Sequence, residues 1–261
     1  MNETSVRVDR DGAVATVTID REEARNALDA ATLDGLISAF TAADADPEVR
    51  VLVLTGAGDR AFCAGADLRS GLTSDATVVD GHEQRGLLRR LFMTTESLGT
   101  PLIGRINGHA LAGGLGVALA CDLLVAVEDA TFGTPEVRVG LWPHVISALL
   151  TQHLGPKRAL EWMMTGRRYP AAEAERLGLV NRVVPREQLD EAVAELAAEL
   201  IRGAPLALAL GRRGFFQARA MDPNAAMAYL HGLLDLQVQT EDAAEGITAF
   251  LERRDPVWRG R

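Results

Sequence analysis

Residues 101–120 read PLIGRINGHALAGGLGVALA, in which a short strand, a glycine-rich turn and a helix of small residues follow one another. The apolar residues 101–106 predict the strand, and residues 113–120 predict the helix. Residues 107–116, which join them, are rich in glycine, so the backbone there can approach a ligand closely. The first turn of the helix also carries unpaired N–H groups and the positive end of the helix dipole. The stretch therefore indicates an α/β fold. Its glycines indicate either a site for a negatively charged oxygen or close packing of the helix against its neighbours.

The same alternation of strands and helices extends on both sides of this stretch, to about residue 185. A continuous apolar run at residues 51–54 predicts a strand that is buried on both faces. Residues 69–81 have little periodicity and predict a loop. The other expected elements are a hairpin with arms at 6–8 and 13–19, helices at 29–40 and around 87–92, and a strand at 123–127. This pattern is typical of an α/β core.

The last third of the chain has a different pattern, because it is almost wholly helical after Pro185. Helical periodicity covers residues 187–201, 205–220 and 224–251. We therefore predict an α/β core at residues 1–202 and a helical C-terminal region at residues 203–261. A long helical region of this kind often forms contacts between subunits.

The composition is that of an ordinary folded protein, with 48% hydrophobic and 24% charged residues among 261. A net charge of −9 argues against binding to nucleic acid or to an anionic membrane surface. No apolar run is long enough to cross a bilayer, and the first residues lack the features of a targeting peptide, so we expect a cytoplasmic protein. The two cysteines and five histidines show no metal-ligand spacing, and we expect no metal site.

A second small-residue segment, AFCAGADL at residues 61–68, follows the buried strand. Such residues can aim free backbone N–H groups at a ligand, but taken alone they more often form only a tight turn. Just before it, residues 56–61 (GAGDRA) imitate the glycine fingerprint of dinucleotide-binding folds. That fingerprint must open an amphipathic helix, whereas residues 62–65 make a poor helix start. We therefore reject a dinucleotide site.

A third segment, FGTPE at residues 132–136, places Glu136 directly after Pro135 in a short loop. An isolated glutamate in such a loop is normally a solvated surface charge. Its interpretation changes when the three segments are considered together, because they occur in a defined order and at defined intervals along the chain.

The ordered set resembles the motifs of the enoyl-CoA hydratase/isomerase (crotonase) superfamily. The motifs are AGAD at 64–67, NGHALAGG at 107–114, CD at 121–122 and FGTPE at 132–136. The similarity also covers ARNAL at 24–28, the segment from Leu141 onward, GPKRA at 155–159, MTGR at 164–167, EA at 173–174 and GLVN at 178–181. It thus extends over essentially the whole chain. The resemblance implies a spiral of ββα units with a helical C-terminal region, assembled as a homotrimer or a homohexamer.

The resemblance also implies the chemistry of the site. Members of this superfamily stabilise an enolate formed from a CoA thioester, and the backbone N–H groups of Ala66 and Gly113 match their oxyanion hole. Fixed donors in a dry pocket stabilise the developing charge most as the transition state is approached. Glu136 matches the catalytic acid/base, and coenzyme A enters as part of the substrate, so we expect no separate cofactor. The positions that match substrate or CoA contacts are Ala24, Arg25, Ala27, Ala64, Gly65, Asp67, Leu68, Gly114, Pro135 and Leu141, with Arg25 as the candidate for a phosphate contact.

One departure from the family pattern concerns the exact reaction. Hydratases of the family use two glutamates to hold and activate water, and the second would fall at Gly116, which has no side chain. A single carboxylate that moves a proton between Cα and Cγ resembles the enoyl-CoA isomerases of the family. Two alternatives stay open: another acyl-CoA reaction, such as hydrolysis or decarboxylation, and an acyl-CoA-binding protein without catalytic activity.

Several neighbouring residues have simpler interpretations. Asp67 is expected to fix its loop as a hydrogen-bond acceptor, and Cys63 to fill packing space and not to act as a nucleophile. Asp122 matches a position that is structural in similar proteins. His109 and His144 belong to segments that line the pocket in similar proteins, so either could touch the substrate.

Overall fold

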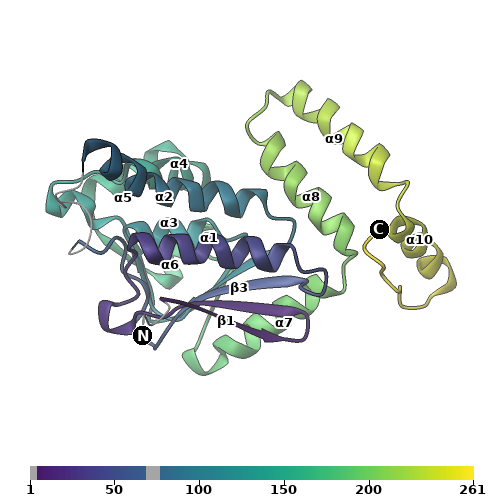
Figure 1. Cartoon of the computed structure of the whole chain (residues 1–261), viewed down its shortest axis with the longest axis horizontal. Coiled ribbons are helices and arrows are strands. Elements are labelled where there is room, and N and C mark those ends of the chain that lie inside the picture. Colours follow the sequence, from purple (N-terminus) through teal and green to yellow (C-terminus); the bar gives the residue numbers. More distant parts are fainter. Residues whose placement is uncertain (1–4, 69–76) are drawn as a thin grey trace.

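The computed structural model describes residues 5–68 and 77–261, and it folds this part of the chain into two β-sheets with helices packed around them (Figure 1). The large sheet contains, in spatial order, β1 (Val6–Asp11), β2 (Val14–Ile19), β3 (Val51–Gly56), β5 (Leu102–Ile106), β7 (Leu123–Val127) and β10 (Arg182–Val184). The small sheet contains β4 (Ala61–Cys63), β6 (His109–Leu111), β8 (Thr131–Gly133) and β9 (Arg168–Pro170).

Ten α-helices and three short 3-10 helices lie within the described residues. The helices of the core are α1 (Ala30–Asp44), α2 (Val78–Ser97), α3 (Gly113–Leu119), α4 (His144–Leu154), α5 (Pro156–Thr165), α6 (Ala171–Arg176) and α7 (Leu189–Ile201). The C-terminal helices are α8 (Pro205–Ala218), α9 (Pro223–Gln237) and α10 (Glu241–Glu252), and the 3-10 helices are η1 (Glu22–Ala24), η2 (Pro135–Val139) and η3 (Arg186–Gln188). Figure 1 shows α1 and α7 on opposite sides of the large sheet.

The chain alternates between the two sheets as it advances. β3, β5 and β7 join the large sheet, whereas the strand that follows each of them, β4, β6 and β8, joins the small sheet. A helix follows each of the first two pairs: α2 comes after β4, and α3 after β6. This arrangement confirms the predicted spiral of ββα units.

Local sequence explains the main elements of the core. All six residues of β3 are buried, because β2 and β5 pair with it in parallel on either side and helices cover the sheet. This burial accounts for its continuous apolar run. α1 begins after Asp29, whose carboxylate accepts the backbone N–H of Thr32 at 2.8 Å, an ordinary N-cap. The predicted helix at 29–40 is therefore present and continues to Asp44.

Two predictions about helices were wrong in detail. Residues 78–81, which we expected in a loop, belong to α2, while residues 69–76 of the same prediction lie outside the described residues. The predicted helix at 224–251 is divided into α9 and α10. Thr240 lies at the division, where its hydroxyl accepts the N–H of Ala243 and caps α10. A cap inside a run of helical periodicity ends one helix and starts another.

The C-terminal helices leave the core after α7, and Figure 1 shows α9 and α10 projecting from it. The predicted boundary at residues 202/203 falls between α7 and α8. α8 is tied back to the core by Arg212, whose guanidinium forms a bidentate ion pair with Asp122 at 2.7 and 2.9 Å. Asp122 also accepts the N–H of Leu102 in β5 at 2.8 Å. Asp122 thus has the structural role that its position in the sequence predicted.

Candidate active site

The small sheet brings the three segments from the sequence analysis together. β4, β6 and β8 are parallel neighbours, so their carboxyl ends lie at one edge of the sheet. Ala66 follows β4, Gly113 follows β6 and Glu136 follows β8. The carboxyl ends of parallel strands are where α/β proteins place their ligands. The edge is therefore the candidate active site.

The amides of Ala66 and Gly113 lie close together. A Cβ built on Gly113 would be 3.6 Å from the backbone nitrogen of Ala66. Leu28 forms an isolated parallel bridge beside Ala66, in which its N–H bonds the oxygen of Gly65 and its oxygen accepts the N–H of Asp67, both at 2.8 Å. The bridge uses the oxygen of Gly65 and the N–H of Asp67, so the N–H of Ala66 takes no part in it. Neither the Ala66 nor the Gly113 amide donates to an acceptor in residues 5–68 or 77–261.

Backbone conformation sets the approach of these two segments. Gly65 has a φ of 97°, and a Cβ on it would lie 2.7 Å from the Cβ of Ala112, so glycine is required for the loop to lie against α3. Ala112, directly before Gly113, has a φ of 51° and a ψ of −130°. A non-glycine residue in such a conformation costs roughly 1–3 kcal/mol, and strain of this kind concentrates at functional sites.

Glu136 occupies η2 and is half-buried. Its Oε2 atom is fully buried and has no hydrogen-bond partner among the described residues. Burial raises the pKa of the carboxyl above its ordinary value, and a hydrogen bond from its own backbone N–H offsets part of that effect. A carboxyl with a raised pKa is better suited to giving and taking a proton near neutral pH.

The position of the second family glutamate is closed. A Cβ on Gly116 in α3 would lie 2.7 Å from the ring of Phe92 and 3.0 Å from a side-chain carbon of Ile146. Both side chains are buried. A carboxylate at residue 116 would therefore need the apolar wall formed by Phe92 and Ile146 to move.

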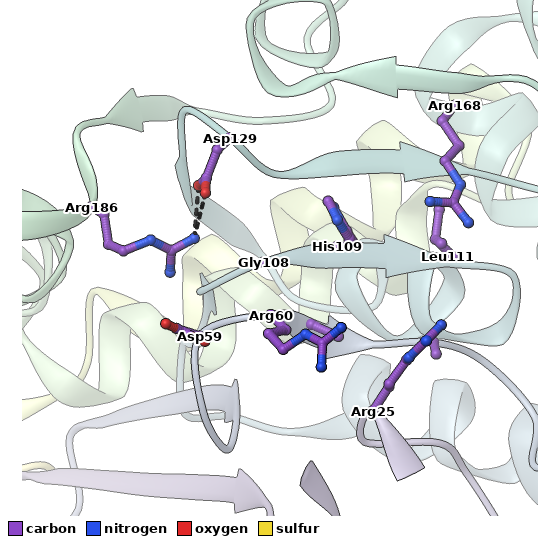
Figure 2. A pocket seen from close by; sticks show the side chains of 11 residues that line it. Arg25, Asp59, Arg60, Gly108, His109, Leu111, Asp129, Arg168 and Arg186 are labelled. Atoms are coloured by element: carbon purple, nitrogen blue, oxygen red, sulfur yellow. Dashed lines mark hydrogen bonds and ion pairs between the residues drawn. The ribbon is translucent and has the colours of Figure 1, made fainter. Parts of the chain in front are cut away.

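An arginine-rich cavity of about 420 Å³ lies against the small sheet (Figure 2). Four arginines and two aspartates line it, namely Arg25, Arg60, Arg168, Arg186, Asp59 and Asp129. Arg186 pairs with Asp129 at 2.7 Å. Figure 2 shows the other three guanidinium groups directed toward one part of the cavity, and none of them has a hydrogen bond or ion pair within the described chain. Three unpaired cations in a protein of net charge −9 indicate a site for an anion.

Comparisons with known proteins show the family of this chain. A family model described as enoyl-CoA hydratase/isomerase matches residues 9–261. The chain belongs to the enoyl-CoA hydratase/isomerase family. Carnitinyl-CoA dehydratase of Salmonella typhimurium is 39% identical over 263 residues, which cover 98% of this chain and 99% of that protein.

Solved structures of the family have the same fold. The enoyl-CoA hydratase from Bacillus anthracis is 32% identical and superimposes with a TM-score of 0.93, covering 98% of this chain and 100% of that one. The enoyl-CoA hydratase of Mycobacterium smegmatis is 33% identical with a TM-score of 0.93, covering 98% and 99%. The predicted membership in the crotonase superfamily and the predicted fold are both confirmed.

One residue that holds the family motifs in place escaped the sequence analysis. The guanidinium of Arg21 pairs with Asp29 at 3.1 Å and with Asp67 at 2.9 Å, and it also donates to the backbone oxygen of Ala27. Arg21 thereby fixes the 24–28 segment against the loop that carries Ala66. Asp67 is a loop-fixing acceptor, as predicted. No local sequence pattern marks this role, because Asp67 lies 46 residues from Arg21 in the chain.

The other predicted contact residues lie around these groups. Arg25 adopts a left-handed conformation with a φ of 55°, and its backbone oxygen accepts the N–H of Ala64 at 3.1 Å. A Cβ on Gly114 would lie 2.1 Å from the backbone oxygen of Cys63, so Gly114 permits close packing on that side and leaves no space there for a ligand. Ala24 ends η1, Ala27 is buried, Pro135 begins η2, and Leu68 and Leu141 are exposed.

Nearby titratable groups differ in their suitability for chemistry. Cys63 is buried, and burial raises the pKa of its thiol to about 12, so it is a packing residue, as predicted. His109 lines the arginine-rich cavity, and its Nδ1 lies 3.0 Å from the hydroxyl of Thr131. Burial first, and then the charge of Arg168, lowers the pKa of His109. His144 is exposed at the start of α4.

Among the described residues, no helix is both long and apolar enough to cross a membrane. No group of three or more metal-binding side chains occurs in the same part of the chain.

Proposed function

We propose that the protein is an acyl-CoA enzyme in which the Ala66 and Gly113 amides bind the thioester oxygen and Glu136 transfers the proton. The observation that supports this most directly is the edge of the small sheet, where two adjacent amides lack acceptors and a carboxyl oxygen is buried without a partner. Two amides aimed at one oxygen stabilise an enolate, and each such donor is worth roughly 2.7–4 kcal/mol of barrier.

The reaction that a single carboxylate performs most simply is isomerisation of a 3-enoyl-CoA. Glu136 as carboxylate removes a proton from C2, and the electrons of that C–H bond form the C1–C2 double bond of a dienolate, with negative charge on the thioester oxygen. The protonated Glu136 then returns the proton to C4. The C3–C4 double bond is lost, a C2–C3 double bond forms and the carbonyl is restored. No cofactor is consumed.

The closed space at Gly116 favours this reaction, because isomerisation needs no second carboxylate. A second candidate is the addition or removal of water at C3, and the name of the carnitinyl-CoA dehydratase relative favours it. In that case Glu136 would act alone on the water and on C2. Both reactions pass through the same enolate and need the same two amides.

We further propose that the three unpaired arginines of the cavity hold the phosphates of coenzyme A. Arg25 and Ala64 belong both to the cavity and to segments that match CoA contacts in the family. Arginine binds phosphate through parallel N–H donors and is well suited to this role. Arg60 and Arg168 join Arg25 in this proposal, although the sequence analysis named only Arg25.

Product analysis of the purified enzyme tests the reaction. Wild type is incubated with 2-enoyl- and 3-enoyl-CoA of several chain lengths, and products are separated and weighed by mass spectrometry. Isomerisation converts the 3-enoyl to the 2-enoyl thioester without a change in mass, and hydration adds one water. Glu136→Gln is expected to lower kcat by about 10²- to 10⁴-fold. Glu161→Gln, at an exposed position of α5, is the matched control and should leave kcat unchanged.

Other outcomes would contradict the proposal. Release of free CoA would indicate thioester hydrolysis, and loss of carbon dioxide from a carboxylated acyl-CoA would indicate a decarboxylase. CoA binding without turnover of any thioester, with no effect of Glu136→Gln, would indicate a non-catalytic acyl-CoA-binding protein.

The C-terminal helices support a proposed homotrimer or homohexamer. α9 spans 15 residues and buries none of them in the single chain. Large apolar side chains are exposed along α8 to α10, with Phe250 at 83%: they are Phe215, Met227, Leu230, Leu234, Leu236, Ile247, Phe250 and Leu251. Exposed apolar surface of this extent marks an interface. Light scattering should give the mass of three or six chains, and a monomer at all concentrations would contradict the assembly.

A further inference from the structure

Thr134 carries a hydroxyl that the fold leaves unpaired. The residue is fully buried, and its Oγ1 atom has no hydrogen-bond partner within the described part of the chain. Buried hydroxyls nearly always have a partner, since an unpaired one costs roughly 1–3 kcal/mol. Only two other buried side-chain atoms among the described residues share this condition, and one of them is Oε2 of Glu136. Two unpaired polar atoms thus occur two residues apart.

The third unpaired atom is the hydroxyl oxygen of Tyr169, and it lies in a different place. Tyr169 lies in β9, where it pairs with Phe132 of β8 and stacks on Trp162 at a ring distance of 3.8 Å. It therefore lies beside the middle of β8, whereas Thr134 lies beyond the carboxyl end of that strand, at the edge that carries the site.

Sheet pairing places Thr134 next to the segment that carries Gly113. The N–H of Ala112 donates to the oxygen of Gly133 at 2.9 Å, so the next residue, Thr134, lies alongside the start of α3. Gly113, whose amide we assign to the thioester oxygen, is the next residue after Ala112. Glu136 follows Thr134 after one proline. The side chain of Thr134 makes no cap for η2, so it has no evident structural task.

We propose that Thr134 is a positioning residue, whose hydroxyl hydrogen-bonds the Glu136 carboxyl in the substrate complex and holds it over the reacting carbons. This inference rests on the proposed function. The two groups are not bonded in the free enzyme, and catalytic hydrogen bonds commonly tighten only when the substrate is bound.

A hydroxyl suits this task because it can serve both protonation states of the acid. It donates to the carboxylate before the proton is taken from C2, and it accepts from the carboxylic acid before the proton is returned. The partner therefore stays in place while the charge on Glu136 changes. A hydrogen bond donated to the carboxylate also favours the ionised form, which opposes the effect of burial.

The test compares Thr134→Val, which has the same shape without the hydroxyl, with Thr134→Ser, which keeps the hydroxyl. Hydrogen bonds to charged groups are worth enough that Thr134→Val should lower kcat by about 10- to 100-fold, with little change in KM. The acidic limb of its kcat–pH profile should move to higher pH, because the carboxylate loses a donor. Thr134→Ser should restore most of kcat and the wild-type profile.

The unfolding temperature of Thr134→Val distinguishes a positioning role of Thr134 from a role in stabilising the fold. Replacing an unpaired buried hydroxyl with a methyl group removes its desolvation cost, so Thr134→Val should unfold at the same temperature as wild type or a higher one. Thr18→Val, at a buried threonine of β2 in the large sheet, is the matched control and should keep wild-type kcat and pH profile.

The outcomes are distinguishable from failure of the proposed function. If wild type and Thr18→Val turn over an enoyl-CoA and Thr134→Val does so with an unchanged kcat and pH profile, Thr134 has no positioning role. A Thr134→Ser variant as slow as Thr134→Val would also overturn it. If wild type itself turns over no acyl-CoA, the proposed function fails first.

Discussion

The two β-sheets of this protein divide stability from chemistry. In the large sheet, β3 buries every residue between two parallel neighbours and carries no group that we assign to the reaction. In the small sheet, β4, β6 and β8 have three residues each. The segments that follow them carry unpaired amides, a strained alanine and a carboxyl with one buried oxygen that has no partner. The well-packed sheet thus supplies the free energy that allows the short-stranded sheet to keep unsatisfied groups for a ligand.

The largest effect on folding should come from the large sheet. Leu54 is buried in β3, and Leu54→Ala leaves a cavity that should lower the free energy of unfolding by about 2–5 kcal/mol. Chemical denaturation measures this loss. The kcat of the folded fraction should match wild type, and a large drop in kcat per folded molecule would show that the two sheets are not independent.

A single methyl group added at the small sheet should lower activity and leave stability unchanged, the opposite of Leu54→Ala. The Cβ of Gly113→Ala would meet its neighbours at 3.6 Å, an ordinary contact, so the fold should accept it. The same methyl enters the space beside the Ala66 amide and should lower kcat/KM by about 10- to 100-fold, part of the value of one oxyanion donor. Steady-state kinetics and thermal unfolding are measured together. Gly86→Ala, in α2 with open space around it, is the control, and equal kinetics for both variants would remove Gly113 from the site.

Variants at Gly116 test whether the tight packing around this residue prevents a second catalytic carboxylate. Gly116→Glu should clash with Phe92 and Ile146 and lower the free energy of unfolding by about 1–3 kcal/mol, as overpacked cores do. Adding Phe92→Ala makes room for the new side chain and should recover part of that loss. If the double variant gains hydration of 2-enoyl-CoA, the closed wall determines the reaction. If Gly116→Glu alone is as stable as wild type, the side chains of Phe92 and Ile146 move aside at little cost.

The smallest effect concerns the pH dependence of stability. Burial raises the pKa of Glu136 in the folded state, so its contribution to stability is fully present below the pKa of the unfolded chain, about 4.3. That contribution is lost as pH rises through the raised folded-state pKa. Glu136→Gln has no charge to bury, so it should be more stable than wild type above that range and gain nothing below it. Thermal unfolding between pH 4 and 8 measures this, and a pH-independent difference would mean that Glu136 is solvated.

The sequence predicted five of the six strands of the large sheet, all except β10, and none of the strands of the small sheet. A strand such as β3 leaves a continuous apolar run, because it is buried on both faces. A three-residue strand leaves no periodic pattern, so β4, β6 and β8 were not expected as strands. Residues 61–63 and 109–111 were instead interpreted as parts of glycine-rich turns.

The segments of the candidate site were identified in spite of this, because their order along the chain resembles the motifs of the family. That resemblance singled out Ala66, Gly113 and Glu136, and the structure brings their segments to one edge of the small sheet. What escaped prediction depends on tertiary contacts. The ion pair of Arg21 with Asp67 joins residues that are distant in the chain, so it has no local sequence pattern. The same holds for Arg60 and Arg168, which the fold brings to one cavity from distant positions.

Cys63 is protected from the chemistry that we propose for the site. Conjugated thioesters are electrophiles that alkylate thiolates, and this sulfur lies only three residues from the Ala66 amide. Its thiol is shielded from solvent and holds its proton up to a pH of about 12, so it offers no thiolate to an electrophilic product. A conjugated thioester formed by the proposed reaction would therefore not inactivate the protein through this residue.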